Sequence, residues 1–217
     1  CAQEEVTTRI DPDPYMLSGP MHLRTNAAAV ALLSMCLFPI PARAGETFTR
    51  DFAHDLLNSV EPYGILVTVG DNDTFPLWYA QEVEGIRRDV IVANTSLLNT
   101  DWYTRQLIRR PVYEYDAEAG PEIYRGKEWP KPEGPVIDMT LEEADRVPLY
   151  QQVTQTSVFQ HGDIQATINP RVLARADLLV LQMIKDSYPE RPIYFSRTSG
   201  PYGPELGLWP YLMTQGS

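Results

Sequence analysis

Acidic and amide side chains follow an apolar stretch in the first half of this chain. Residues 64–69 read GILVTV, and Asp71, Asn72 and Asp73 come directly after the glycine that follows them. Two carboxylates separated by one residue can hold a hard divalent cation such as Mg²⁺ or Mn²⁺, because such ions prefer oxygen ligands. A structural role also suits these residues, with Asp73 capping the next helix and Asp71 bonding the amides of a turn. The sequence favours the structural role and leaves a divalent cation on Asp71 and Asp73 as the alternative.

Polar residues also follow two further apolar stretches, residues 89–93 (DVIVA) and 191–196 (RPIYFS). In sheets of parallel strands, ligands bind beyond the carboxyl ends of the strands, where loops and helix N-termini converge. The sequence therefore predicts a ligand-binding site at that edge of a sheet. Its candidate residues are Asp71, Asn72, Asp73, Asn94, Asn99, Asp101 and Arg197.

Aromatic residues stand near the starts of the two helices that follow the first and second stretches. They are Trp78, Tyr79, Trp102 and Tyr103. Such rings can stack against the face of a sugar, but aromatic residues at these positions more often belong to the core. We therefore expect them to be mainly structural.

Motifs for other chemistry are missing from the sequence. His22, His54 and His161 are too far apart for zinc-ligand spacing. The sequence contains no G-x-S-x-G, Walker or G-x-G-x-x-G motif, which removes the commonest hydrolase and nucleotide-binding interpretations. We assign no catalytic residue and no cofactor beyond the alternative cation.

The spacing of apolar residues predicts the elements that must position these side chains. Buried strands are predicted at residues 64–69, 89–93 and 191–196, because each is a short apolar run. Helices are predicted at residues 52–60, from Asp73 or Thr74 to Gly85, from Asn99 or Thr100 to Pro111, and from Asn169 to Ile184. Strands that alternate with helices indicate an α/β fold, and we predict a small three-layer sandwich with a mainly parallel sheet.

Two further segments flank or interrupt this pattern. Prolines recur through residues 111–168, so we expect a Pro-rich insertion there, in which short pieces such as residues 135–139 could pair at a sheet edge. Residues 1–48 form an N-terminal arm, and residues 49–217 form the α/β domain.

The arm contains an apolar run, AAAVALLSMCLF, at residues 27–38. Extended toward residue 44 it could just cross a bilayer, or it could be the middle of a secretory signal, or it could pack as a buried helix or against a neighbouring subunit. We expect residues 27–41 to contact a membrane or neighbouring subunits, which places the rest of the chain outside the cytoplasm. Cys36 lies within this run, and Cys1 has the position of a lipid-modified first residue.

The composition excludes one class of partner. With 18 basic and 29 acidic residues the chain carries a net charge of −11, which repels nucleic-acid phosphates. We therefore expect no nucleic-acid partner.

Residues 50–107, from RDFAHDLLNS to TDWYTRQL, resemble the C-terminal region of a family of bacterial multi-spanning membrane proteins. This family is grouped with protein O-mannosyltransferase-like enzymes, and residues 174–196 are similar to its closing helix and strand. The resemblance implies that a membrane-embedded glycosyltransferase module precedes such a domain. Its catalytic acidic residue has no matching position here.

Three functions follow as hypotheses. The first is a non-catalytic extracytoplasmic accessory domain of a glycosyltransferase-like membrane protein, which binds a glycan or an acceptor protein. The second is a secreted or lipid-anchored structural subunit of an extracellular filament or surface assembly. The third is a metal-dependent sugar transferase that uses Asp71 and Asp73.

Overall fold

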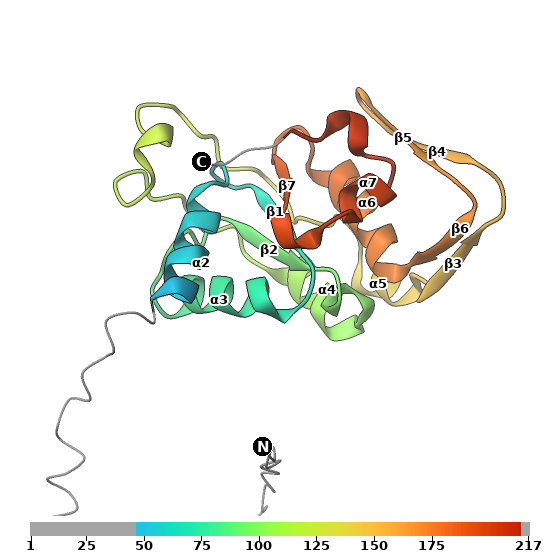
Figure 1. Ribbon diagram of the computed structural model, residues 1–217, viewed down its shortest axis with the longest axis horizontal. Coiled ribbons are helices and arrows are strands. Elements are labelled where there is room, and N and C mark those ends of the chain that lie inside the picture. The colour runs from blue at the N-terminus through green and yellow to red at the C-terminus, as the bar shows by residue number, and fades with distance from the viewer. Residues whose placement is uncertain (1–46, 214–217) are drawn as a thin grey trace, which may run out of the picture. The chain divides into compact units, whose positions relative to one another are not determined.

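The computed structural model describes residues 47–213 (Figure 1). The described residues all belong to one compact unit. The expectations for Cys1, Cys36 and the apolar run at residues 27–41 lie outside the described residues. Within residues 47–213, none of the helices combines the length and the apolar composition that a bilayer crossing requires.

Three parallel strands form the central sheet in the order β2-β1-β7. They are β1 (Ile65–Thr68), β2 (Ile91–Asn94) and β7 (Ile193–Phe195). Ile65 of β1 pairs with Ile91 on one side and with Ile193 on the other. All four residues of β1 are buried, as expected for a central strand covered on both faces. The sequence prediction of three short buried strands in a parallel sheet is confirmed.

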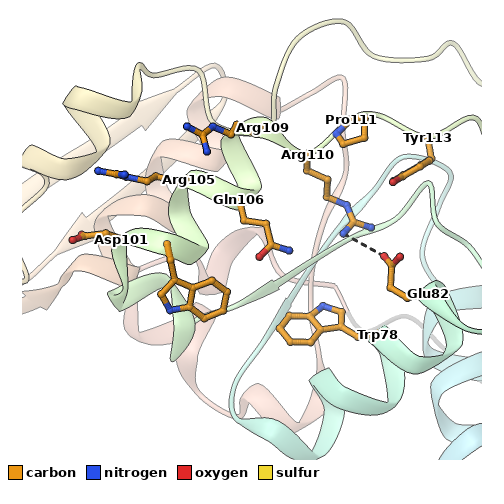
Figure 2. Close-up of a pocket in the computed structure, with 10 residues that line it drawn as sticks. Trp78, Glu82, Asp101, Arg105, Gln106, Arg109, Arg110, Pro111 and Tyr113 are labelled. Carbon is orange, nitrogen blue, oxygen red and sulfur yellow. Dashed lines mark ion pairs between the residues drawn. The ribbon is translucent and has the colours of Figure 1, made fainter. Parts of the chain in front are cut away.

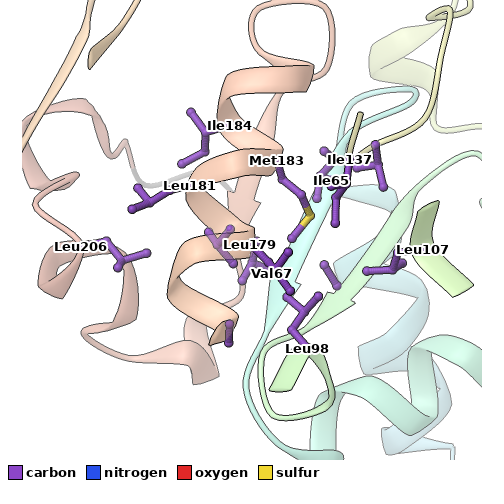
Figure 3. Close-up of a cluster of buried hydrophobic side chains, with 14 of the residues drawn as sticks. Ile65, Val67, Leu98, Leu107, Ile137, Leu179, Leu181, Met183, Ile184 and Leu206 are labelled. Atoms are coloured by element: carbon purple, nitrogen blue, oxygen red, sulfur yellow. The ribbon is translucent and has the colours of Figure 1, made fainter. Parts of the chain in front are cut away.

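Alternate residues of the strands pack against helices on opposite faces of the sheet. Leu66 and Val92 point toward α2 (Phe48–Asn58) and α3 (Asp71–Glu82), where Leu57 and Leu77 complete the smaller core cluster. The other face packs against α4 (Asp101–Arg109) and α6 (Arg175–Ser187) (Figure 3). Its side chains include Ile65, Val67, Leu107, Leu179 and Met183. Helices on both faces of a parallel sheet confirm the predicted three-layer α/β fold.

α3 begins earlier than the sequence predicted. Its first residue is Asp71 and its N-cap is Gly70, so neither Asp73 nor Thr74 caps it. Gly70 has φ 83° and ψ −174°, a backbone conformation that is essentially limited to glycine. This glycine turns the chain into the helix, and only Val69 and Gly70 separate β1 from α3. The Thr74 hydroxyl lies inside the helix and donates to the carbonyl of Gly70 at 2.8 Å.

α6 begins later than predicted, because residues 171–174 form a strand. β6 (Arg171–Ala174) pairs antiparallel with β3 (Tyr150–Val153), and α6 starts at Arg175. In β6, Val172 is exposed and Leu173 is buried, which is the alternation of a strand and not of a helix. The prediction that Asn169 opens the helix was therefore wrong.

The Pro-rich segment carries regular structure of its own. It contains η2 (Glu122–Tyr124), α5 (Leu141–Arg146), β3, and the antiparallel pair β4 (Ser157–His161) and β5 (Ile164–Ile168). A capping box between Thr140 and Glu143 starts α5. Residues 135–139 form no strand, and Val136 and Ile137 are buried in the larger core cluster instead. The chain also forms the short helices η1 (Leu97–Asn99), η3 (Arg197–Ser199), α7 (Tyr202–Glu205) and η4 (Trp209–Tyr211).

Candidate functional site

An open groove of about 970 Å³ runs along α3 and α4, which we call the α3–α4 groove (Figure 2). α3 contributes two residues of its lining, α4 contributes five, and the segment that follows α4 contributes three. The lining consists of Trp78, Glu82, Asp101, Trp102, Arg105, Gln106, Arg109, Arg110, Pro111 and Tyr113.

The helical repeat of α4 explains why its polar residues line one surface. Trp102, Arg105, Gln106 and Arg109 follow the spacing i, i+3, i+4, i+7, which places them on one face. Tyr103, Thr104 and Leu107 lie on the other face and are buried. α4 therefore packs an apolar face against the sheet and presents a row of indole, guanidinium and amide groups to the groove.

Two tryptophan side chains give the groove apolar surface. Trp102 is 56% exposed, and its ring lies 5.5 Å from that of Tyr103 in an edge-on arrangement. Trp78 is half-buried and lies 6.0 Å from the same ring. The Trp102 indole is thus held by a buried neighbour while much of its surface faces solvent.

Tyr103 connects the groove to the sheet. Its hydroxyl donates to the carbonyl of Val92 at 2.9 Å and accepts from the backbone N–H of Asn94 at 3.1 Å. Burial raises the pKa of Tyr103 to about 12, although the hydrogen bond from Asn94 and the charge of Arg110 oppose this shift. Tyr103 therefore stays neutral at physiological pH and serves as a support.

The arginines of the groove differ in how firmly they are paired. Arg105 forms a two-pronged bond with Asp145 of α5, with one N–O distance of 3.0 Å. This bond raises the pKa of Arg105 and lowers that of Asp145. Arg110 approaches Glu82 only at 3.9 Å, and its Nε and Nη2 have no hydrogen-bond partner among the described residues. Arg109 is exposed, and within residues 47–213 it forms no ion pair.

The predicted D-x-D pair lies in the first turn of α3. Asp71 is exposed, whereas Asp73 is only 2% exposed and its Oδ2 has no hydrogen-bond partner among the described residues. Side chains two residues apart on a helix point in different directions, so the two carboxylates do not face one ion. No group of three or more metal-ligating side chains occurs in the described part of the chain. A cation on Asp71 and Asp73 stays a prediction, and this helical geometry does not favour it.

Two of the three predicted asparagines, Asn94 and Asn99, form hydrogen bonds that hold the loop after β2. Asn94 is buried and donates to the carbonyl of Gly70 and to the Thr74 hydroxyl, both at 2.8 Å, and it accepts from the N–H of Leu97. The Asn99 side chain donates to the carbonyl of Thr95 at 3.1 Å and accepts from the N–H of Ala176 at the start of α6. These hydrogen bonds give both amide side chains a structural role in the loop after β2.

Asp101 alone among the seven candidate residues lines the α3–α4 groove. Its carboxylate forms an ion pair with Arg175, whose side chain is buried at the start of α6. Asn72 is exposed at the start of α3, and Arg197 is exposed in η3 just after β7. The other six candidate residues do not line the groove, and a ligand role for all seven stays a prediction.

The sequence analysis singled out none of the groove residues Arg105, Gln106, Arg109, Arg110 and Tyr113. A usable signal was present, because the residues between the buried positions of α4 share one face. The contribution of Glu82 from α3 depends on tertiary packing and has no such local signal.

The whole groove, from Trp78 to Tyr113, falls inside a region that matches a known family. No curated protein and no solved structure matches the chain. Residues 49–160, just over half of the 217 residues, match TMEM260-associated domain 2. The chain therefore belongs to the TMEM260-associated domain 2 family.

Proposed function

We propose that this protein is a non-catalytic, extracytoplasmic accessory domain of a glycosyltransferase-like membrane protein, and that it binds a glycan in the α3–α4 groove. The family match and the resemblance to protein O-mannosyltransferase-like membrane proteins support the accessory role. The composition of the groove supports the glycan.

The observation that carries the proposal is the pairing of an exposed indole with planar polar side chains. A sugar ring has an apolar C–H face, which packs on an aromatic ring, and hydroxyl groups at its edge, which need donors and acceptors. Trp102 offers the ring, and Gln106 and Glu82, which also line the groove, offer amide and carboxylate groups to the hydroxyls.

The charge pattern supports a binding role over catalysis in this groove. Its two carboxylates, Glu82 and Asp101, both contact arginines, and Asp101 is paired with the buried Arg175. Neither is placed as a free general acid or base. The acceptor protein of a sugar-transfer reaction would meet the domain through the glycan that it carries.

Calorimetry with a panel of neutral and acidic oligosaccharides tests the proposal. We expect binding by the native protein and at least a tenfold loss of affinity in Trp102→Ala, because the stacking surface is removed. Trp209→Ala is the matched control, since Trp209 is 72% exposed in η4 and lies outside the groove. The proposal fails if no oligosaccharide binds, or if both variants bind as tightly as the native protein.

A second candidate function, a structural subunit of an extracellular assembly, is favoured by an apolar ridge on α2 and α3. Three exposed apolar residues are spaced four apart along α3 and its C-cap: Phe75, Tyr79 and Val83. Phe48 is exposed at the start of α2. Exposed apolar patches of this kind often mark protein contacts. Sedimentation of the native protein and of a Phe75→Ser/Tyr79→Ser variant separates the two functions, because only an assembly through this ridge would dissociate.

A further inference from the structure

We propose that the α3–α4 groove selects sugars that carry an anionic group, a carboxylate or a phosphate, that Arg110 binds this group, and that Arg109 adds to the positive charge that attracts it. The inference rests on the proposed glycan-binding function and specifies its ligand. It follows from a comparison of the charged side chains of the groove, some of which have a close ion-pair partner while others do not.

Pairing leaves two of the three groove arginines uncommitted. Arg105 is satisfied by the two-pronged bond with Asp145. Arg109 has no ion pair in the described part of the chain, and the nearest carboxylate to Arg110 is Glu82 at 3.9 Å. That separation is too long for a hydrogen bond. The Glu82 carboxylate also lies 3.6 Å from Arg88, so it is shared between two guanidinium groups.

Arg110 is held in place by its surroundings while it lacks acceptors. Only 12% of its side chain is exposed, and its guanidinium lies 5.8 Å from the ring centre of Tyr113. Its Nε and Nη2 have no hydrogen-bond partner within residues 47–213. Buried charged donors normally have partners, so a guanidinium with such weak pairing calls for an anion. Glu82 is 52% exposed and can turn into solvent when a ligand anion takes its place.

The remaining charges leave the groove electropositive although the chain is acidic. The carboxylate of Asp101 is compensated by Arg175, and that of Glu82 is shared with Arg88. Arg110 has only the Glu82 carboxylate, which it shares with Arg88, and Arg109 has no ion pair among the described residues, so positive charge exceeds negative charge in the groove of a protein whose net charge is −11. The overall negative charge repels long polyanions, whereas a single anionic group on a sugar can enter the groove.

The spacing of α4 places these arginines beside the stacking surface. Trp102 and Arg109 share one face of the helix, and Arg110 directly follows its last residue. Guanidinium groups bind carboxylate and phosphate oxygens in pairs, and they do so better than lysine does. Figure 2 shows the Arg110 side chain extending toward Glu82 and Trp78, whereas the Arg109 side chain extends in the opposite direction. A sugar in the groove would thus present its anionic substituent toward Arg110.

The test uses the full-length chain and two matched pairs of probes. Trigalacturonate is compared with its methyl ester, and glucose 6-phosphate is compared with glucose, by calorimetry or by NMR titration for the weaker ligands. We expect one charged probe to bind at least tenfold more tightly than its neutral counterpart. The pair that shows the difference identifies the anion as a carboxylate or a phosphate.

Variants assign the preference to the two arginines. Arg109→Gln and Arg110→Gln should each lower affinity for the charged probe at least fivefold and leave affinity for the neutral probe unchanged. Arg109 is exposed, so Arg109→Gln keeps the test valid if Arg110→Gln fails to fold. Arg146→Gln is the control, because 76% of the Arg146 side chain is exposed at the end of α5, outside the groove lining.

The outcomes separate this inference from the proposed function. Equal binding of charged and neutral probes overturns the anion preference and leaves glycan binding intact. If neutral oligosaccharides from the wider panel bind and neither charged probe binds, the anion preference is also overturned and glycan binding stands. Failure of every oligosaccharide to bind overturns both.

Discussion

At the scale of single residues, Tyr103 has the clearest structural role. Its hydroxyl bridges Asn94 and Val92 at the end of β2, and its ring lies beside both groove tryptophans. Tyr103→Phe leaves the N–H of Asn94 without its acceptor in a buried position. We expect a loss of about 1–2 kcal/mol in the free energy of unfolding, measured by urea titration. Tyr79→Phe should change it by less than about 0.5 kcal/mol, because Tyr79 is 54% exposed.

Tyr103 also predicts how the free energy of unfolding depends on pH. The pKa of Tyr103 is about 12 in the folded protein and 10 in its unperturbed state. Below pH 10 the phenol is protonated in both states, so its contribution to stability is complete. Between pH 10 and 12 the unfolded chain loses the proton first, and the contribution falls by about 2–3 kcal/mol. The stability difference between native protein and Tyr103→Phe should therefore shrink and then change sign as the pH rises through this window, and parallel curves would contradict the assignment.

Sequence reasoning at this scale identified polar residues at the ends of the strands but not their contacts. Asn94 and Asn99 stay predicted ligand residues, and the structure shows that each also fastens the loop after β2. The contacts of an asparagine side chain depend on atoms that are distant in sequence. For Asn99, one such atom is the backbone nitrogen of Ala176, which donates to its side-chain oxygen. Arg110 was missed for the same reason, since its weak pairing depends on the position of Glu82.

At the scale of elements, Gly70 controls the passage from β1 into α3. Its backbone conformation, φ 83° and ψ −174°, disfavours any residue with a Cβ atom, although the space around it is open. Gly70→Ala should therefore lower the free energy of unfolding by about 1–3 kcal/mol through backbone strain alone. The neighbouring exposed substitution Asn72→Ala should stay within about 0.5 kcal/mol. Equal stability of both variants in urea would show that the turn tolerates a side chain.

Elements were predictable where a local pattern and the tertiary environment agreed. β1 and β2 are continuous apolar runs, and α4 has a regular buried face between a threonine N-cap and a proline, so these three were predicted well. The start of α6 was predicted wrongly, because residues 171–174, whose composition is compatible with a helix, pair with β3 instead. That pairing joins residues about 20 apart, and no local pattern reveals it.

At the scale of the whole molecule, the α/β sandwich followed from the order of strands and helices, whereas the groove did not. The sheet needs only that apolar runs alternate with amphipathic segments, and this is visible in the sequence. The groove requires that α3 and the segment after α4 meet on the surface, which becomes known only from the packing. All of its lining lies within the family region at residues 49–160, so it belongs to the part of the chain that defines the family.

Hydrogen exchange measured by mass spectrometry, with and without a bound oligosaccharide, tests the central claim most directly. Binding in the α3–α4 groove should slow amide exchange in residues 101–113 and near residues 78–82. Exchange at residues 71–73 and 197–199 should be unchanged, because these strand-end residues lie outside the groove lining. Protection confined to the strand ends, with none in residues 101–113, would contradict the account.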